Sequence, residues 1–237
     1  SYEKYQNMLR MFFIGIALLT TTAALCQNKK EMDEPVHHFC VNINAGLGAN
    51  YNTWFLEVQG EYNPISFLGI NVGMKFLNPC KQDESLHIVC PEGKYELDEY
   101  STFMYHFILH PSIHLCAPAI KLDNVGDKLI FRMEYGILLP LNHFTKGHAY
   151  PQPDNGQLPD SYSPIDIKNI KSGTPFYHET SVSANLVSDR WKFTLGYTFS
   201  NLDIYGSARN AYLGNTHIEF EKKKRGDEVF IGIGYYL

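Results

Sequence analysis

Three histidines recur at every fourth position of one segment, His106, His110 and His114, a spacing that would gather them around a metal ion on a helix. Neighbouring Phe107 and Ile113 favour extended structure instead. On a strand that rises about 3.3 Å per residue, successive histidines of this series lie roughly 13 Å apart, too far to share one ion. Because no Cys-x-x-Cys pair or Cys/His quartet with ligand spacing occurs, we predict no metal site and a structural role for these histidines.

A second group has the residue types of a hydrolytic site: His178, Glu179, Thr180 and Ser181. Nucleophilic catalysis needs a nucleophile, a base and an orienting acid at one level of the fold. Adjacent residues of a strand point to opposite faces, so His178 and Glu179 could not act together. We therefore predict no catalysis and no cofactor. A hydrolase that modifies lipids at the membrane rim is the alternative.

These residues lie on segments in which apolar and polar side chains alternate. In one of them, Trp191 and Leu195 belong to the apolar series and Lys192 to the polar series. Alternation with period two predicts a strand. An aromatic-rich apolar face opposite Gly, Asn, Ser, Thr and charged residues is typical of a barrel with lipid outside and a polar interior. In the fourth segment we expect bulges or a bend at Pro111 and Pro118. The predicted strands are 39–51, 54–63, 67–77, 100–120, 129–141, 176–187, 191–200 and 228–237.

The links between these segments alternate in length. Those after the second, fourth and sixth segments are short, whereas 78–99, 142–175 and 202–227 are long. The link after the first segment is the exception, because it is short but lies on the side of the long loops. An even number of antiparallel strands with short turns at one rim and long loops at the other is typical of bacterial outer-membrane barrels. We therefore predict an all-β fold, an eight-stranded antiparallel up-and-down transmembrane β-barrel with long extracellular loops. A soluble β-sandwich is the alternative.

Charged residues occur on the polar faces of the predicted strands, which would turn them into the lumen. Eight strands enclose a space only just wide enough for side chains, so a general porin is excluded and the charges must pair. We predict an ion-pair network that fills the lumen. A proton or ion path along the same groups is the alternative. The network comprises Glu57, Glu61, Lys75, Arg132, Glu134, Glu179 and Lys192.

Near the start of the printed sequence lies a segment with the layout of a cleaved signal peptide. A short basic stretch ending at Arg10 precedes an apolar run over 11–19 and a small-residue tail that ends at Cys26. We predict that 1–26 is a signal peptide with an upstream extension, 27–38 a periplasmic lead and 39–237 the barrel domain. A transmembrane helix and a lipid-modified Cys26 are the alternatives.

Four cysteines follow the predicted cleavage point. Export to an oxidising compartment permits disulfides, and Cys80 and Cys90 flank one loop segment, which makes them the candidate pair. Cys40 and Cys116 lie on segments that we do not place side by side, so we expect free thiols there.

The chain resembles the small OmpA/OmpX-type family of outer-membrane β-barrels. The resemblance rests on the signal segment, the last segment Phe230-Ile231-Gly232-Ile233-Gly234-Tyr235-Tyr236-Leu237 and the glycine-dotted first and third segments. It implies a barrel in the bacterial outer membrane that meets outer-membrane lipid and the barrel-assembly machinery. Aromatic residues would form girdles at the two membrane interfaces. The periplasmic girdle comprises Tyr62, Phe67, Trp191 and Tyr235, and the outer one Trp54, Phe76 and Phe199.

The long loops are the part of the chain most suited to contacts. The 142–175 link is rich in proline and includes Tyr150 and Tyr162, which predicts a stiff surface for an extracellular protein or a glycan. A net charge of −5 excludes a typical nucleic-acid-binding protein. We expect a non-catalytic structural or adhesive protein. An accessory barrel of a transport or secretion complex is a further alternative.

Overall fold

A computed structural model describes residues 38–48, 53–79, 87–90, 93–97, 105–122, 126–142, 146–152, 165–169, 174–208, 210–218 and 226–237. The predicted signal peptide, and the periplasmic lead up to residue 37, lie outside these ranges. Within them the regular structure is β-strand, apart from one 3-10 turn, η1 (Gly206–Ala208). This part of the chain includes no helix of the length and hydropathy needed to cross a membrane.

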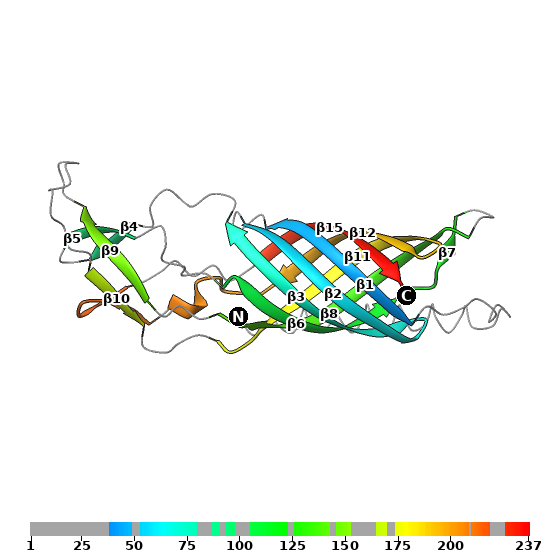
Figure 1. The fold of residues 1–237 in the computed structure, drawn as a ribbon, viewed down its shortest axis with the longest axis horizontal. Coiled ribbons are helices and arrows are strands. Elements are labelled where there is room, and N and C mark those ends of the chain that lie inside the picture. Colours follow the sequence, from blue (N-terminus) through cyan, green and yellow to red (C-terminus); the bar gives the residue numbers. More distant parts are fainter. Residues whose placement is uncertain are drawn as a thin grey trace, which may run out of the picture.

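Eight strands of the described chain close into one antiparallel barrel (Figure 1). Around the barrel the order is β11, β12, β15, β1, β2, β3, β6 and β8, and pairing of β8 with β11 closes the ring. One strand matches each predicted segment, so the predicted barrel is confirmed. The strands are β1 (Phe39–Gly48), β2 (Thr53–Ile65), β3 (Leu68–Pro79), β6 (Phe107–Cys116), β8 (Lys128–Pro140), β11 (Tyr177–Ser188), β12 (Trp191–Ser200) and β15 (Gly226–Tyr236).

Burial alternates along the barrel strands, with apolar side chains outside and polar ones inside. Along β2, Leu56 and Val58 are 42% and 49% exposed, whereas Glu57 is 5% exposed. Lys75 of β3 is 1% exposed, while Ile231 of β15 is 65% exposed. A water-soluble sandwich has the reverse distribution, because an apolar outer surface is favourable only against lipid. The fold is therefore a membrane β-barrel, and the β-sandwich alternative is wrong.

The two rims of the barrel differ in their connections. At one rim β2 turns into β3 through Ser66 and Phe67, and β11 turns into β12 through Asp189 and Arg190. Asp189 has φ 52°, the left-handed conformation that a tight hairpin turn requires and that Asp tolerates. The links that follow β3, β8 and β12 leave the opposite rim (Figure 1).

Strand β6 passes through Pro111 without a bulge. Its register with β8 is the same before and after that residue, so of the bulge or bend expected at Pro111, the bulge is wrong. A proline in a ladder removes one N–H donor but inserts no extra residue. The expected irregularity occurs instead around Pro118. There β6 ends at Cys116, and β7 (Ile120–Lys121) resumes pairing with β8 one residue out of register.

Parts of the three long links pair with one another in a second, six-stranded sheet, which we call the cap sheet (Figure 1). We made no strand prediction for these links. One face of the cap sheet is apolar and buried, with Ala149, Ile167 and Leu213 on it. In the described chain the strand order is β14 (Thr216–His217), β13 (Ala211–Leu213), β10 (Ile165–Asn169), β9 (Lys146–Gln152), β5 (Gly93–Leu97) and β4 (His87–Cys90).

The apolar core lies at the loop-side rim, where barrel and cap sheet share one cluster of buried residues. The barrel, the cap sheet and the segment between β12 and β13 all contribute to it, so the long links and the barrel rim form one packed unit. Its members are Phe55, Leu77, Tyr95, Tyr105, Ile108, Leu138, Ala149, Ile167, Tyr177, Leu202, Ile204, Tyr205, Ala208, Ala211, Leu213 and Ile218.

The exposed apolar belt predicts the effect of a charge placed on it. Leu195 of β12 is 60% exposed on the outer face, and a cation at the membrane midplane costs about 2–4 kcal/mol. We expect Leu195→Arg to reduce membrane assembly, measured as loss of the fast-migrating folded band in an unheated gel. The matched control, Tyr150→Arg on the cap sheet, should assemble normally. Normal assembly of Leu195→Arg would show that this face does not meet lipid.

Candidate functional site in the barrel lumen

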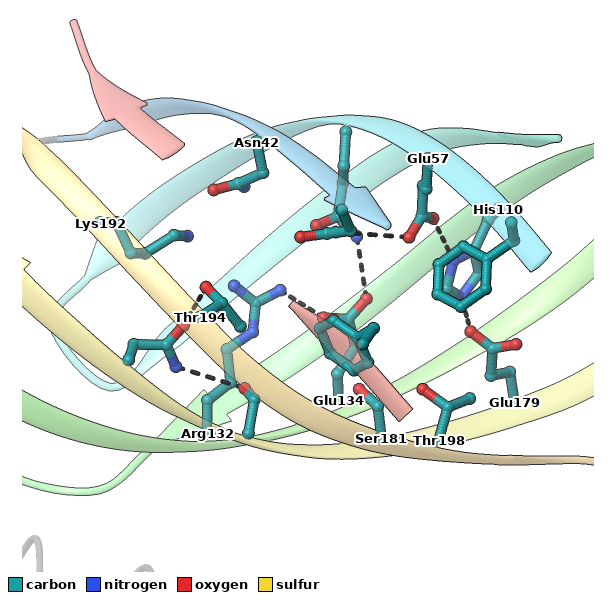
Figure 2. A pocket seen from close by; sticks show the side chains of 16 residues that line it. Asn42, Glu57, His110, Arg132, Glu134, Glu179, Ser181, Lys192, Thr194 and Thr198 are labelled. Atoms are coloured by element: carbon teal, nitrogen blue, oxygen red, sulfur yellow. Dashed lines mark hydrogen bonds and ion pairs between the residues drawn. The ribbon is translucent and has the colours of Figure 1, made fainter. Parts of the chain in front are cut away.

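The lumen holds all seven of the charged residues that the sequence analysis assigned to it. They come from β2, β3, β8, β11 and β12, where every second residue points inward, and each is 8% exposed or less. Figure 2 shows many of these side chains converging on one internal polar cavity. The ion pairs form two clusters, one nearer the long loops and one nearer the short turns.

The loop-side cluster is centred on Lys75. Its Nζ lies 2.9 Å from an oxygen of Glu179 and also pairs with Glu228. His110 Nδ1 donates to Glu57 Oε1 at 2.7 Å, and its Nε2 lies 3.8 Å from Glu179 Oε1 (Figure 2). Three carboxylates thus surround one lysine and one histidine. Lys75 Nζ also lies 4.3 Å from the centre of the Phe55 ring, a cation–π contact.

The turn-side cluster is centred on Glu61 and Arg132. Glu61 Oε2 accepts from Arg132 Nη1 at 2.7 Å and from Lys192 Nζ at 2.5 Å. Arg132 also pairs with Glu134. Glu134 Oε1 in turn accepts from Ser112 at 2.5 Å. Here two carboxylates meet two cations, so the formal charges of this cluster balance.

Glycines on the inward face make room for these side chains. A Cβ at Gly136 would lie 2.2 Å from His110 Nε2, and one at Gly73 would lie 2.6 Å from Glu57 Oε1. Glycine is therefore required at these inward positions, because a larger residue would collide with a charged side chain in the narrow lumen.

Three further members of the network were not predicted from the sequence: Glu228, His110 and His114. Glu228 has the same strand parity as inward Gly232 and Gly234, and this period-two signal could have placed it inside. His110 and His114 also share one face of β6, and His114 Nε2 lies 2.8 Å from Asn63 Oδ1.

The third histidine of the series is separate from the lumen. His106 Nδ1 lies 3.0 Å from the carbonyl oxygen of Leu77, and its ring stacks on Phe76. Among the described residues, no three His, Cys, Asp or Glu side chains lie close enough together to hold a metal ion.

The group considered for hydrolysis is divided between the two faces of β11. Glu179 and Ser181 are buried in the lumen, whereas His178 lies on the outer face. His178 Nδ1 is hydrogen-bonded to Tyr135 Oη at 2.7 Å, and the two rings stack. At the rim, the fold therefore brings together His178 and Tyr135. Glu179, the acid of the predicted group, points into the lumen instead.

The predicted aromatic girdles lie toward the two ends of the barrel. Near the short turns, Trp191 packs edge-on against Tyr235 with ring centres 5.1 Å apart, and Tyr62 packs on Phe39. Phe67 lies in the β2–β3 turn itself. Near the long loops, the Trp54 and Phe76 rings are 5.7 Å apart. Phe199, near the same rim, is paired with Tyr197.

Two cysteines are described in full, and both are free thiols. Cys40 is buried on β1, and its Sγ donates to Asn42 Oδ1 at 3.3 Å; Cys116 is half-buried at the end of β6. The predicted pair of Cys80 and Cys90 lies outside the residues whose side chains the structure describes.

Comparison with known proteins finds likeness in structure only. No protein-family model and no curated protein sequence matches the chain. Several solved structures align with it, including a de novo designed transmembrane β-barrel, Neisserial surface protein A and the NanC porin. The designed barrel has 12% sequence identity and a TM-score of 0.40, and the alignment covers 87% of this chain and 100% of that one. Neisserial surface protein A has 12% identity, a TM-score of 0.42 and coverages of 85% and 97%, and the NanC porin has 10% identity, a TM-score of 0.27 and coverages of 83% and 100%. The assignment of the fold rests on the strand pairing and burial of this chain itself.

The loop-side cluster predicts a large cost for removing its lysine. Lys75→Met leaves the carboxylates of Glu179 and Glu228 buried without their cation, and breaking a buried pair in this way costs about 3–5 kcal/mol. We expect the free energy of unfolding to fall by that amount, measured by urea unfolding in detergent micelles.

A second variant separates charge from shape. In Lys75→Met combined with Glu228→Gln, only the Glu179 carboxylate remains charged without its lysine partner. The double variant should therefore recover part of the stability that Lys75→Met loses. Equal stability of Lys75→Met and the parent protein would show that the pairs contribute nothing.

Proposed function

We propose that the protein is a non-catalytic barrel of the bacterial outer membrane that presents the cap sheet to the cell exterior as a contact surface. The inside-out distribution of its side chains supports a membrane barrel. The short turns at one rim and the elaborated links at the other support an orientation with the cap outside. Outer-membrane lipid and the barrel-assembly machinery are its proposed partners during assembly.

The proposal of a contact surface rests on the side chains at the outer face of the cap sheet. Its buried and exposed residues alternate, and the exposed ones are aromatic, basic and acidic. His148 Nδ1 lies 3.0 Å from Asp166 Oδ1, and the rings of Tyr212 and His217 are 5.2 Å apart. Such a face offers flat rings and hydrogen-bonding groups to an extracellular protein or a glycan. The exposed or half-exposed residues are His148, Tyr150, Asp166, Lys168, Tyr212 and His217.

The lumen supports a structural role. Ion pairs and hydrogen bonds cross and narrow the space that a general porin would leave open to large solutes. At the rim, the separation of Glu179 from His178 favours a non-catalytic barrel over a lipid hydrolase, because a base without an orienting acid lacks the arrangement that nucleophilic catalysis requires.

The proposed orientation predicts which end of the molecule is accessible on intact cells. Lys168→Cys places a thiol on the exposed face of the cap sheet, and Lys121→Cys places one at the opposite rim. We expect a membrane-impermeant maleimide to label the first variant on intact cells and the second only after the outer membrane has been permeabilised. The parent protein controls for its native cysteines. The reverse labelling pattern would overturn the orientation.

The contact surface predicts the effect of removing its tyrosines. We expect Tyr150→Ser combined with Tyr212→Ser to abolish binding of the purified, folded barrel to an array of glycans and extracellular proteins, since both rings lie on the proposed face. Lys121→Ala at the other rim should bind like the parent. If the parent protein bound nothing on the array while its overexpression changed the membrane lipids, the hydrolase alternative would replace the adhesive role.

A further inference from the structure

The loop-side mouth of the barrel is ringed by apolar residues, in contrast to the charged lumen below it. Phe55, Leu77, Ile108, Leu138 and Tyr177 come from five different barrel strands, and each is 4% exposed or less. These residues belong to the apolar core shared with the cap sheet. A buried apolar ring across a polar passage is the arrangement that excludes ions and water most effectively.

Residues 202–208, the segment between β12 and the cap sheet, pack in the same buried cluster as this ring, and we call them the mouth plug. Its side chains at Leu202 and Ile204 are each 1% exposed and belong to the same apolar cluster. The segment is fixed through its backbone as well, because Tyr105 N donates to the carbonyl oxygen of Ile204 at 3.1 Å. Gly206 fits tightly, since a Cβ there would lie 2.1 Å from Tyr177 Oη.

Below the mouth plug the lumen is polar along its length. The internal cavity is lined mainly by polar and charged side chains, among them Asn42 and Lys192 near the short turns (Figure 2). Its lining also includes Phe55 of the apolar cluster and Phe230, which packs against that cluster. Among the described lumen residues, five glutamates face three lysine or arginine side chains, which favours cations over anions. The five are Glu57, Glu61, Glu134, Glu179 and Glu228, against Lys75, Arg132 and Lys192.

We propose that the mouth plug, and not the ion-pair network beneath it, is the barrier that closes the barrel to small cations. The polar lumen ends at this mouth, where the plug is apolar at Leu202 and Ile204 and also includes the buried residues Asp203 and Ser207. Because the plug continues directly into β13 of the cap sheet, a partner that shifts that sheet also shifts the plug. This gives the barrel a closed state under the cap and a cation-conducting state when the plug is displaced.

Ion flux through purified full-length protein in liposomes tests the proposal. Leu202→Ser combined with Ile204→Ser removes two buried apolar side chains from the plug itself. Gly206→Leu adds a side chain that would collide with Tyr177 and so displaces the plug. We expect both variants to raise the rate of potassium flux about tenfold over the parent, which corresponds to a barrier lower by about 1.4 kcal/mol. The reversal potential in a potassium chloride gradient should show cation preference.

Two measurements keep the result decisive. The folded band in an unheated gel selects preparations in which the barrel strands have paired into a closed ring. Asn215→Ala, at an exposed position in the turn between β13 and β14, should leave the flux at the parent value. Folded plug variants with parental flux would show that the ion pairs alone seal the lumen, and would overturn the proposal. A leak without cation preference, or an equal rise in Asn215→Ala, would also overturn the proposal, because either result places the path outside the plugged lumen.

Discussion

A charge enclosed by a narrow barrel must find its partner inside that barrel, because moving an ion out of water costs several kcal/mol unless an opposite charge and hydrogen bonds replace the solvent. This constraint links strands that are far apart in the sequence. Lys75 of β3 reaches Glu179 of β11 and Glu228 of β15, and Glu61 of β2 reaches Lys192 of β12. The pairs therefore tie opposite walls together, while the backbone ladders tie only neighbours. Inward glycines follow from the same constraint, since large ionised side chains need space across the lumen.

The barrel was predictable because its signal is local. Period-two alternation places each residue on one face whatever its distant neighbours are, and even Pro111 left the register unchanged. The seven inward charges followed from the same alternation. Glu228, His110 and His114 carry that signal too, but Glu228 lies near the start of β15, and the two histidines were considered only as metal ligands. Their partners were not predictable, because alternation gives the face of a residue and not its height in the barrel.

The cap sheet was not predictable from alternation. Its strands are short, from two residues in β14 to seven in β9, and they pair across three separate links. A strand of two or three residues carries almost no periodic signal, and its existence depends on an apolar face that finds cover elsewhere in the fold. Here the cover is the apolar core at the barrel mouth. The same contacts turn links that composition alone would leave as surface loops into a packed extension of the barrel, and they give the polar outer face of the cap a rigid support.

One pairing in the ring differs from all the others. Every other contact between barrel strands joins consecutive strands of the up-and-down order, whereas β1 and β15 meet across almost the whole described sequence, with Cys40 opposite Tyr236. This seam is the step with the largest loss of chain entropy. Until β15 docks, β1 and β12 both present unpaired backbone edges, which are templates for aggregation. A factor that shields those two edges during synthesis would therefore govern the yield of assembled protein more than any feature of the finished fold.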